Sequence, residues 1–213
     1  MDIAILIYDR FTALDAVGPY EVLSRLPGAK VTFVAERAEP KRTDTAQLAL
    51  LADATIDELT HPDILLVPGG PGQAALMDDG PVHRWLRTAD QTSTWTASVC
   101  TGSLILAAAG LLTGRRATSN WQAIDELRAL GADATPERVV FDGKLATSAG
   151  VTAGIDMALE LAAKIAGLQV AQAIQLGLEY DPQPPFDSGS PRTAPAEIVE
   201  AVRAYSRFAE QPA

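Results

Sequence analysis

The chain has 213 residues, of which 47% are hydrophobic and 21% charged, and its formal net charge at pH 7 is −10. This length suits one well-filled α/β domain, and the composition excludes a disordered chain. The acidic balance, without any basic run, argues against a nucleic-acid-binding protein, because phosphate backbones are repelled by a negative surface.

The first half of the chain alternates apolar runs with amphipathic stretches. The apolar runs predict buried parallel strands at residues 3–8, 31–35, 64–67 and 94–99. Apolar residues at helical spacing predict helices at residues 14–26, 81–90 and 101–112. Gly18-Pro19 predicts a separate or kinked first turn in the first of these helices. The polar residues 36–47 predict a loop or a short edge hairpin.

The second half continues the same alternation. Helices are predicted at residues 121–130 (ended by Gly131), 151–165, 170–178 and from Pro195 to about Phe208. Asp142-Gly143 predicts a two-residue hairpin turn between strands 138–141 and 144–147, and residues 181–194 predict an ordered loop. We therefore expect one α/β domain over residues 1–213, with a mostly parallel sheet and helices on both faces.

Other classes of protein are disfavoured by what the sequence lacks. No run approaches the roughly 18 apolar residues of a membrane helix. The first residues lack the basic start and long apolar stretch of a signal peptide, so we expect a cytoplasmic protein. One cysteine cannot form an internal disulfide, and with two distant histidines it makes a poor zinc site. We therefore expect no disulfide, no metal and no membrane contact.

Cys100 carries the strongest chemical signal in the sequence. It lies where the strand 94–99 meets a helix that begins at Thr101, with no loop between them. Such a turn places its apex residue at the carboxyl edge of the sheet and projects it into solvent. The positive end of the helix would lower the pKa of the thiol, which favours a nucleophile. A buried structural cysteine is the alternative.

A glycine-rich segment follows the strand 64–67 and should lie at the same edge. In Pro68-Gly69-Gly70-Pro71-Gly72, glycines would let the backbone approach a ligand closely. The N–H of Gly70, with that of Thr101, could form an oxyanion hole beside the sulfur. An ordinary turn is the alternative, and the segment lacks the Lys-Ser/Thr pair of a phosphate-binding loop.

Asp15 follows the first strand, which also places it near the carboxyl edge. Its apolar neighbours would partly bury the carboxyl, raise its pKa and suit it to exchange protons with a thiol or a substrate. From this stretch alone, a helix N-cap is the more common role, and Glu21 is a second candidate acid. His61 and His83 are predicted at the surface away from this edge, so a Cys-His-acid triad is not expected.

Six segments together resemble the ThiJ/PfpI superfamily, and within it the isonitrile hydratases. They are Leu14-Asp15-x-x-Gly18-Pro19, Val67-Pro68-Gly69-Gly70, Ser98-Val99-Cys100-Thr101-Gly102-Ser103, Gly110–Thr118, Gly150–Asp156 and Leu178–Phe186. The resemblance implies a flavodoxin-like three-layer sandwich, a homodimer and an enzyme without a cofactor. It also implies the hydration of isonitriles to N-substituted formamides, with Cys100 as nucleophile, Asp15 as general acid and base, and Thr101 assisting.

One position departs from the pattern of many relatives. Where they carry a histidine before a tryptophan, this sequence has Asn120 before Trp121. An asparagine can donate a hydrogen bond to a substrate but cannot act as a base, so Cys-His chemistry is disfavoured. Two alternatives stay open: a stress-response protein that senses oxidants through oxidation of Cys100, and a glyoxalase-like or hydrolytic enzyme for small electrophiles. The chain is too short after residue 192 for the DNA-binding module of related regulators.

Overall fold

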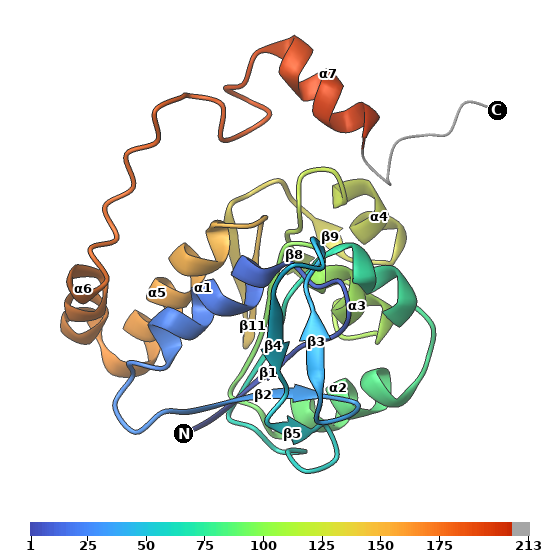
Figure 1. Cartoon of the computed structure of the whole chain (residues 1–213), viewed down its shortest axis with the longest axis vertical. Coiled ribbons are helices and arrows are strands. Elements are labelled where there is room, and N and C mark those ends of the chain that lie inside the picture. The colour runs from blue at the N-terminus through green and yellow to red at the C-terminus, as the bar shows by residue number, and fades with distance from the viewer. Residues whose placement is uncertain (206–213) are drawn as a thin grey trace.

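The computed structural model describes residues 1–205, so the expected helix residues 206–208 lie outside the described part. Figure 1 shows a central sheet with helices around it. Its strands, in spatial order, are β10 (Val139–Asp142), β11 (Leu145–Ser148), β7 (Trp95–Val99), β6 (Ile64–Val67), β1 (Asp2–Leu6), β2 (Lys30–Ala35) and β5 (Ala54–Thr55). β10 and β11 are antiparallel, and all other neighbouring strands in this sheet are parallel.

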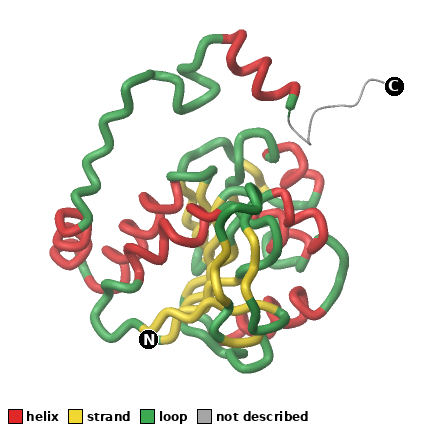
Figure 2. The backbone as a smooth tube through the Cα atoms, viewed as in Figure 1, coloured by secondary structure: helices red, strands yellow, loops and turns green. Residues whose placement is uncertain are grey.

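Helices cover both faces of this sheet, which confirms the expected architecture (Figures 1 and 2). One face carries α1 (Ala13–Leu23), α5 (Ala153–Ala166) and α6 (Leu168–Gly177), and the other carries α2 (Pro81–Thr92), α3 (Gly102–Ala108) and α4 (Ile124–Ala129). The central strands are rich in apolar residues because both of their faces are buried: every residue of β6 is apolar and inaccessible to solvent. This continuous burial is why these strands were predictable.

Two local predictions need correction. Of the separate or kinked first turn expected at Gly18-Pro19, the separate turn is wrong, because α1 runs without interruption from Ala13 to Leu23 with Pro19 inside it. Gly18 instead allows α1 to approach α5: a Cβ at this position would lie 3.0 Å from the Ile155 side chain. The polar stretch does form an edge hairpin, but it lies later than expected, with β3 (Pro40–Arg42) antiparallel to β4 (Ala49–Leu51).

Several short elements were not predicted. They are β5, the two-residue strands β8 (Arg116–Ala117) and β9 (Asp133–Ala134), and the 3-10 helix η1 (Pro71–Leu76). Elements of this length are too short to show a hydrophobic period. The Asp142-Gly143 hairpin is confirmed: Asp142 pairs with Leu145, and Gly143 has the φ of 62° that its turn requires.

After α6 the chain leaves the body. Residues 181–187 run as a segment that stands away from the helices, a turn follows at residues 190–194, and α7 (Ala196–Ala204) lies beyond it (Figures 1 and 2). We call residues 181–205 the C-terminal arm. Within residues 1–205, no helix is both long enough and apolar enough to cross a membrane.

Candidate active site

Three segments of the chain meet at the carboxyl edge of the sheet. β1 pairs with β6, and β6 pairs with β7, so the segments that follow these strands lie side by side. They carry Asp15, the Gly69-Gly70 loop and Cys100, which the sequence placed at this edge. Because the three strands are adjacent, residues far apart in the sequence form one site here.

Cys100 lies on a strained turn between β7 and α3. Its φ is 57°, a left-handed value that costs a non-glycine residue free energy and persists only where neighbours enforce it. Two hydroxyls do so, because Ser119 Oγ and Ser103 Oγ donate to the Cys100 carbonyl at 3.0 and 3.1 Å. Gly102 makes the turn possible, since a Cβ there would lie 2.1 Å from the Val67 carbonyl oxygen.

The environment of the sulfur differs from what the sequence predicted. Cys100 was expected to project into solvent with a lowered pKa, but the residue is only 6% exposed. Burial, and then the negative charge of Asp15, raise the pKa of the thiol. The Thr101 N–H and the Asn120 amide donate to the sulfur and oppose this shift without overcoming it. The resting nucleophile is therefore a thiol, which must lose its proton as it reacts.

Asp15 is the group beside this thiol that can take the proton. It is fully buried, and the Gly69 N–H donates to its Oδ2 at 3.0 Å. Its Oδ1 has no well-aligned hydrogen-bond partner among the described residues. Burial raises the pKa of Asp15 to about 7, although hydrogen bonds from Gly69 and Cys100 act to lower it. A carboxyl with this pKa can both accept and donate a proton at neutral pH.

The alternative role of Asp15 as a helix N-cap is wrong. Thr12 occupies the N-cap position of α1, and Asp15 is the third residue of the helix itself. Thr12 Oγ1 donates to Asp44 Oδ2 at 2.8 Å, which places a second carboxylate near the site. Glu21, the other candidate acid, lies on the surface in an ion pair with Arg25. Asp15 is thus the candidate acid that contacts Cys100.

The Gly69-Gly70 loop holds side chains rather than offering a free pair of N–H groups. Gly69 donates to Asp15, and the Gly70 N–H donates to Thr101 Oγ1 at 3.0 Å. The Gly70 N–H expected in an oxyanion hole is therefore already engaged by Thr101. The backbone must come close to do this, because a Cβ on Gly69 would lie 2.5 Å from the Thr101 nitrogen. The loop thereby aligns the acid with the residue after the nucleophile.

Asn120 and Gly150 border the sulfur on another side. The Gln122 N–H donates to Asn120 Oδ1 at 3.0 Å, and this orients the Asn120 amide so that its Nδ2 donates to Cys100 Sγ. A Cβ on Gly150 would lie 2.7 Å from that Nδ2 and 3.0 Å from Sγ. Sequence reasoning missed the roles of Gly150 and Ser119, although the Gly150 segment was among those that resembled the family.

A small cavity borders Ser119 and Gly150, two residues that also lie next to Cys100. Its volume is about 140 Å³, and its walls include Ser119, Trp121, Arg138, Gly150, Ser190 and Arg192. The volume suits a small molecule rather than a drug-sized one. Ser190 and Arg192 belong to the C-terminal arm, so the arm forms the outer wall of this cavity.

Neither histidine contacts these residues. His61 is exposed, as predicted, and lies 3.2 Å (Nδ1 to Oγ1) from Thr92. His83 was predicted at the surface, which is wrong: it is buried, and its Nε2 bonds to the Leu76 carbonyl at 2.8 Å. No cluster of His, Cys, Asp or Glu within residues 1–205 could hold a metal ion.

Comparisons with known proteins show the family to which the chain belongs. The chain belongs to the DJ-1/PfpI family, whose model matches residues 1–164. It is 44% identical over 203 residues to the isonitrile hydratase of Pseudomonas putida, covering 95% of this chain and 89% of that protein. The crystal structure of a ThiJ/PfpI family protein from Pseudomonas syringae covers 98% of this chain and 88% of its own, with a TM-score of 0.92 and 40% identity.

A third relative matches only part of this chain. The HTH-type transcriptional regulator CdhR of Pseudomonas aeruginosa is 37% identical over 126 residues. That match covers 58% of this chain but only 37% of the regulator. Most of the regulator therefore lies outside the matched part.

Proposed function

We propose that this protein hydrates small isonitriles to N-substituted formamides, with Cys100 as nucleophile and Asp15 as its proton partner. The contact between a buried thiol and a carboxyl of pKa about 7 carries this proposal. The 44% identity to an isonitrile hydratase, over nearly the whole of both chains, supports it.

The first step joins the sulfur to the isonitrile carbon. Asp15 accepts the thiol proton as Cys100 Sγ attacks the terminal carbon of R–NC. Asp15 then returns that proton to the same carbon, which gives a thioimidate, R–N=CH–S–Cys100. A carboxyl that is half-protonated near neutral pH can serve as base and acid in turn, and this sort of catalysis contributes roughly 10²–10⁴-fold.

The second step consumes water and releases the enzyme. Asp15 accepts a proton from water as the water oxygen adds to the thioimidate carbon, and Asp15 then passes this proton to the nitrogen. The tetrahedral adduct, R–NH–CH(OH)–S–Cys100, then expels the sulfur, and its hydroxyl proton passes to Cys100 to leave R–NH–CHO and the free thiol. The sum of both steps is the addition of one water molecule to the isonitrile. The Thr101 N–H and the Asn120 amide, which already donate to the sulfur, stabilise it as it leaves.

The alternative of oxidant sensing is less well supported by the environment of the sulfur. Peroxides react with thiolates, so sensor cysteines have a lowered pKa and are accessible to solvent. Cys100 has a raised pKa and is buried. The same contact with Asp15 that hinders thiolate formation in the resting protein is useful for a reaction that transfers the proton to a substrate.

Turnover of an isonitrile labelled with ¹³C at its terminal carbon tests the proposal. We expect the carbon-13 signal of the isonitrile to be replaced by that of a formamide, and Cys100→Ala to abolish this while keeping the circular dichroism of the fold. Mass spectrometry of stopped reactions should show an adduct of one substrate mass on the peptide that contains Cys100. No formamide from alkyl or aryl isonitriles would contradict the proposal. A gain of two oxygens on Cys100 in mild peroxide, without turnover, would favour oxidant sensing.

A further inference from the structure

The cavity that borders Ser119 and Gly150 is positively charged, although the protein as a whole is acidic. Its walls include Arg138 and Arg192, and none of its described lining residues is an aspartate or a glutamate. The formal charge of the chain is −10, so most of the surface repels an anion. A cavity of the opposite sign in such a protein favours an anionic ligand over a neutral one.

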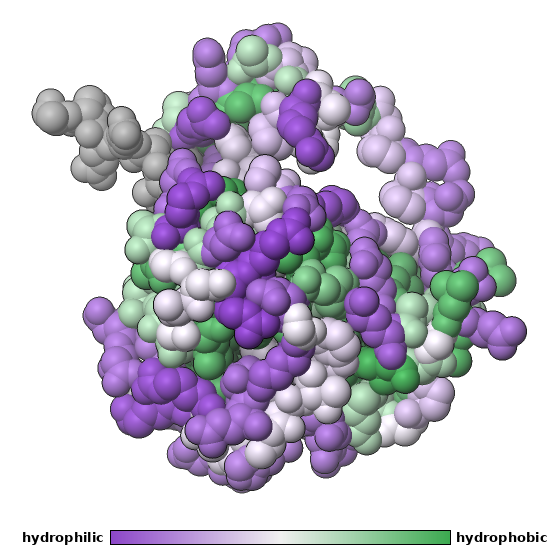
Figure 3. Space-filling view, turned by 180° about the vertical axis from the view of Figure 1, so that it is seen from behind, coloured by the Kyte–Doolittle hydropathy of each residue, from purple (hydrophilic) through white to green (hydrophobic). Residues whose placement is uncertain are grey.

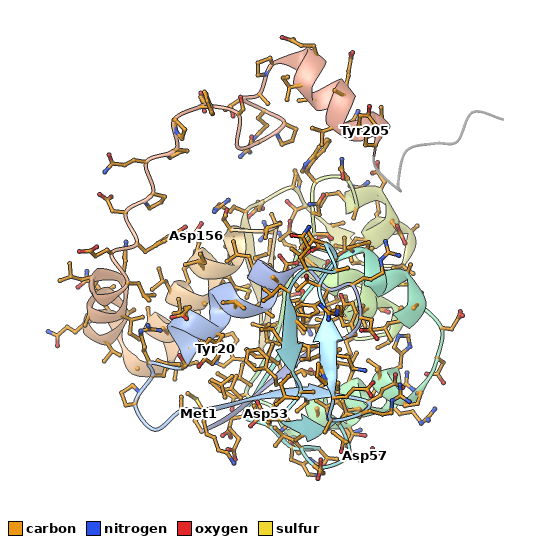
Figure 4. All side chains as sticks on the ribbon, in the orientation of Figure 1. Met1, Tyr20, Asp53, Asp57, Asp156 and Tyr205 are labelled. Carbon is orange, nitrogen blue, oxygen red and sulfur yellow. The ribbon has the colours of Figure 1, made fainter. Side chains whose placement is uncertain are left out.

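The first of these arginines is already paired. Arg138 forms an ion pair through its Nε with Asp156 Oδ2, and its Nη2 donates to Thr152 Oγ1 at 3.2 Å. Tyr180 Oη donates to the other oxygen of Asp156 at 2.7 Å. Figure 4 labels Asp156 on α5, below the C-terminal arm. These contacts fix the Arg138 side chain and balance its charge.

The second arginine has no such partner. The backbone N–H of Arg192 donates to Ser190 Oγ at 3.1 Å, and the N–H groups of Thr193 and Ala194 donate to the Ser190 carbonyl at 3.1 and 2.9 Å. This turn fixes the point from which the Arg192 side chain extends. Its guanidinium makes no hydrogen bond or ion pair with any described residue. Its N–H donors and its positive charge are therefore available to a ligand.

The arm that carries Arg192 is held against the body beside the cavity. Gln122 Nε2 donates to the Val202 carbonyl at 3.2 Å, and Arg203 lies over the Trp121 ring, 5.4 Å from its centre. Figure 3 shows an open gap between the earlier part of the arm and the body, which the arm meets again near α7. Trp121 also lines the cavity, where it offers a flat apolar wall to a ring or an alkyl group.

The cavity lies close to the nucleophile. Gly150 forms part of its wall, and a Cβ on Gly150 would lie 3.0 Å from Cys100 Sγ. Ser119, another wall residue, donates through its Oγ to the Cys100 carbonyl at 3.0 Å. A small molecule in the cavity is thus separated from Cys100 by the thickness of one residue.

We propose that the isonitriles hydrated by this protein carry a carboxylate, which Arg192 binds while the isonitrile carbon reaches Cys100. The inference rests on the proposed isonitrile hydration and names the chemical class of the substituent R. A guanidinium can bind a carboxylate through two parallel hydrogen bonds, and charge-assisted bonds of this kind are about twice as strong as neutral ones. Trp121 would flank the part of R between the two ends. The product is then a formamido acid, because the added water leaves the carboxylate unchanged.

A pair of substrates that differ in charge but hardly in shape tests this inference. The pair is 4-isocyanobenzoate and 4-isocyanobenzamide. We expect kcat/KM for the carboxylate to exceed that for the amide by about tenfold, because a charge-assisted hydrogen bond contributes roughly this factor. The ratio of the two values should fall as the ionic strength rises to about 1 M, because salt screens an exposed charge.

Substitutions at position 192 connect this preference to the arginine. Arg192→Gln should abolish the preference for the carboxylate, and Arg192→Lys should keep part of it, because a lysine retains the charge but not the planar pair of donors. Arg84→Gln is the matched control: it removes the same charge at an exposed position on α2 and should keep the full preference. A purely structural role of Arg192 would change both rates alike, so an unchanged ratio in Arg192→Gln would overturn the inference.

Binding to an inactive variant gives a readout that needs no turnover. Calorimetry on Cys100→Ala protein should give a Kd about tenfold lower for 4-formamidobenzoate than for 4-formamidobenzamide, and Arg192→Gln in the same background should remove this difference. If no isonitrile is hydrated but this difference is found, the proposed function fails and the anion site beside Cys100 stands. If isonitriles are hydrated but neither turnover nor binding prefers the carboxylate, the inference fails and the proposed function stands.

Discussion

The backbone N–H of Gly69 donates to the Asp15 carboxyl across 3.0 Å, and this bond joins the loop after β6 to the helix after β1. One oxygen of Asp15 is thereby held in place, and the other is left buried without a well-aligned partner among the described residues. A carboxyl held in this way has one free oxygen with which to exchange protons with the thiol and with a substrate.

Asp15→Asn should lower kcat/KM for isonitrile hydration by at least about two orders of magnitude. The amide keeps the shape of the carboxyl and can still accept from Gly69, but it cannot accept the thiol proton. In the wild-type protein, kcat/KM should rise with pH through about 7, because the reactive form has Asp15 ionised and Cys100 protonated. A pH–rate profile measures both effects. Full activity in Asp15→Asn would refute this assignment.

The same buried carboxyl should make the fold less stable at high pH. The folded pKa of Asp15, about 7, lies above the ordinary value of 3.8 for an aspartate, so the folded state binds more protons between these values. The free energy of unfolding should therefore fall as the pH rises from 4 to 7. Asp15→Asn removes this penalty and should stabilise the protein at pH 8 by up to about 4 kcal/mol, with little effect at pH 4.

Urea unfolding at both pH values measures this difference, with Asp53→Asn as the control at an exposed carboxyl. Asp53→Asn should show no comparable gain at pH 8. The difference in the free energy of unfolding between Asp15→Asn and the wild type is the quantity to compare. If this difference were the same at pH 4 and pH 8, the carboxyl would not titrate as described.

Gly150→Ala should impair the site without unfolding the protein. Its Cβ would lie 2.7 Å from Asn120 Nδ2 and 3.0 Å from Cys100 Sγ, so one of these groups must move. We expect kcat/KM to fall by about tenfold or more, because the Asn120 amide would no longer donate to the sulfur. Gly177→Ala is the matched control, since its Cβ would meet nothing within 4 Å. Equal kinetics for the two variants would contradict this role of Gly150.

Neither histidine should affect catalysis. His61→Gln and His83→Gln should each change kcat/KM by less than about threefold, since neither side chain contacts Cys100 or Asp15. His83→Gln should nevertheless lower stability by about 1–2 kcal/mol, because the buried ring bonds to the Leu76 carbonyl. Kinetics and thermal unfolding of both variants separate the two effects. An inactive but folded His83→Gln protein would reopen the case for Cys-His chemistry.

The parts of the fold that could be predicted from sequence are those with a strong local signal. Residues 3–6 of β1 and all of β6 are continuous apolar runs, β7 is buried at every residue after Trp95, and Asp142-Gly143 has the turn chemistry of a tight hairpin. The same strands placed Cys100 and Asp15 at one edge, because each residue closely follows a parallel strand. The proximity of the two side chains is thus a consequence of the strand order.

What the sequence did not reveal depends on contacts between distant residues. The burial of Cys100 comes partly from Asn120 and Gly150, which lie well beyond the β7–α3 turn in the sequence. The pKa of its thiol was predicted in the wrong direction because the helix end was visible in the sequence, but the burial and the carboxylate neighbour were not. His83 was misplaced for a similar reason: its partner Leu76 belongs to η1, an element too short to predict.

The strand order also determines how activity returns after unfolding. The residues of the site follow β1, β6 and β7, which are neighbours in the sheet but distant along the chain. Helices form in about a microsecond, whereas parallel strands must first close long loops, and this is slow. Circular dichroism should therefore recover before turnover when denaturant is diluted. The recovery of enzymatic activity would then report the time at which β1, β6 and β7 pair with one another.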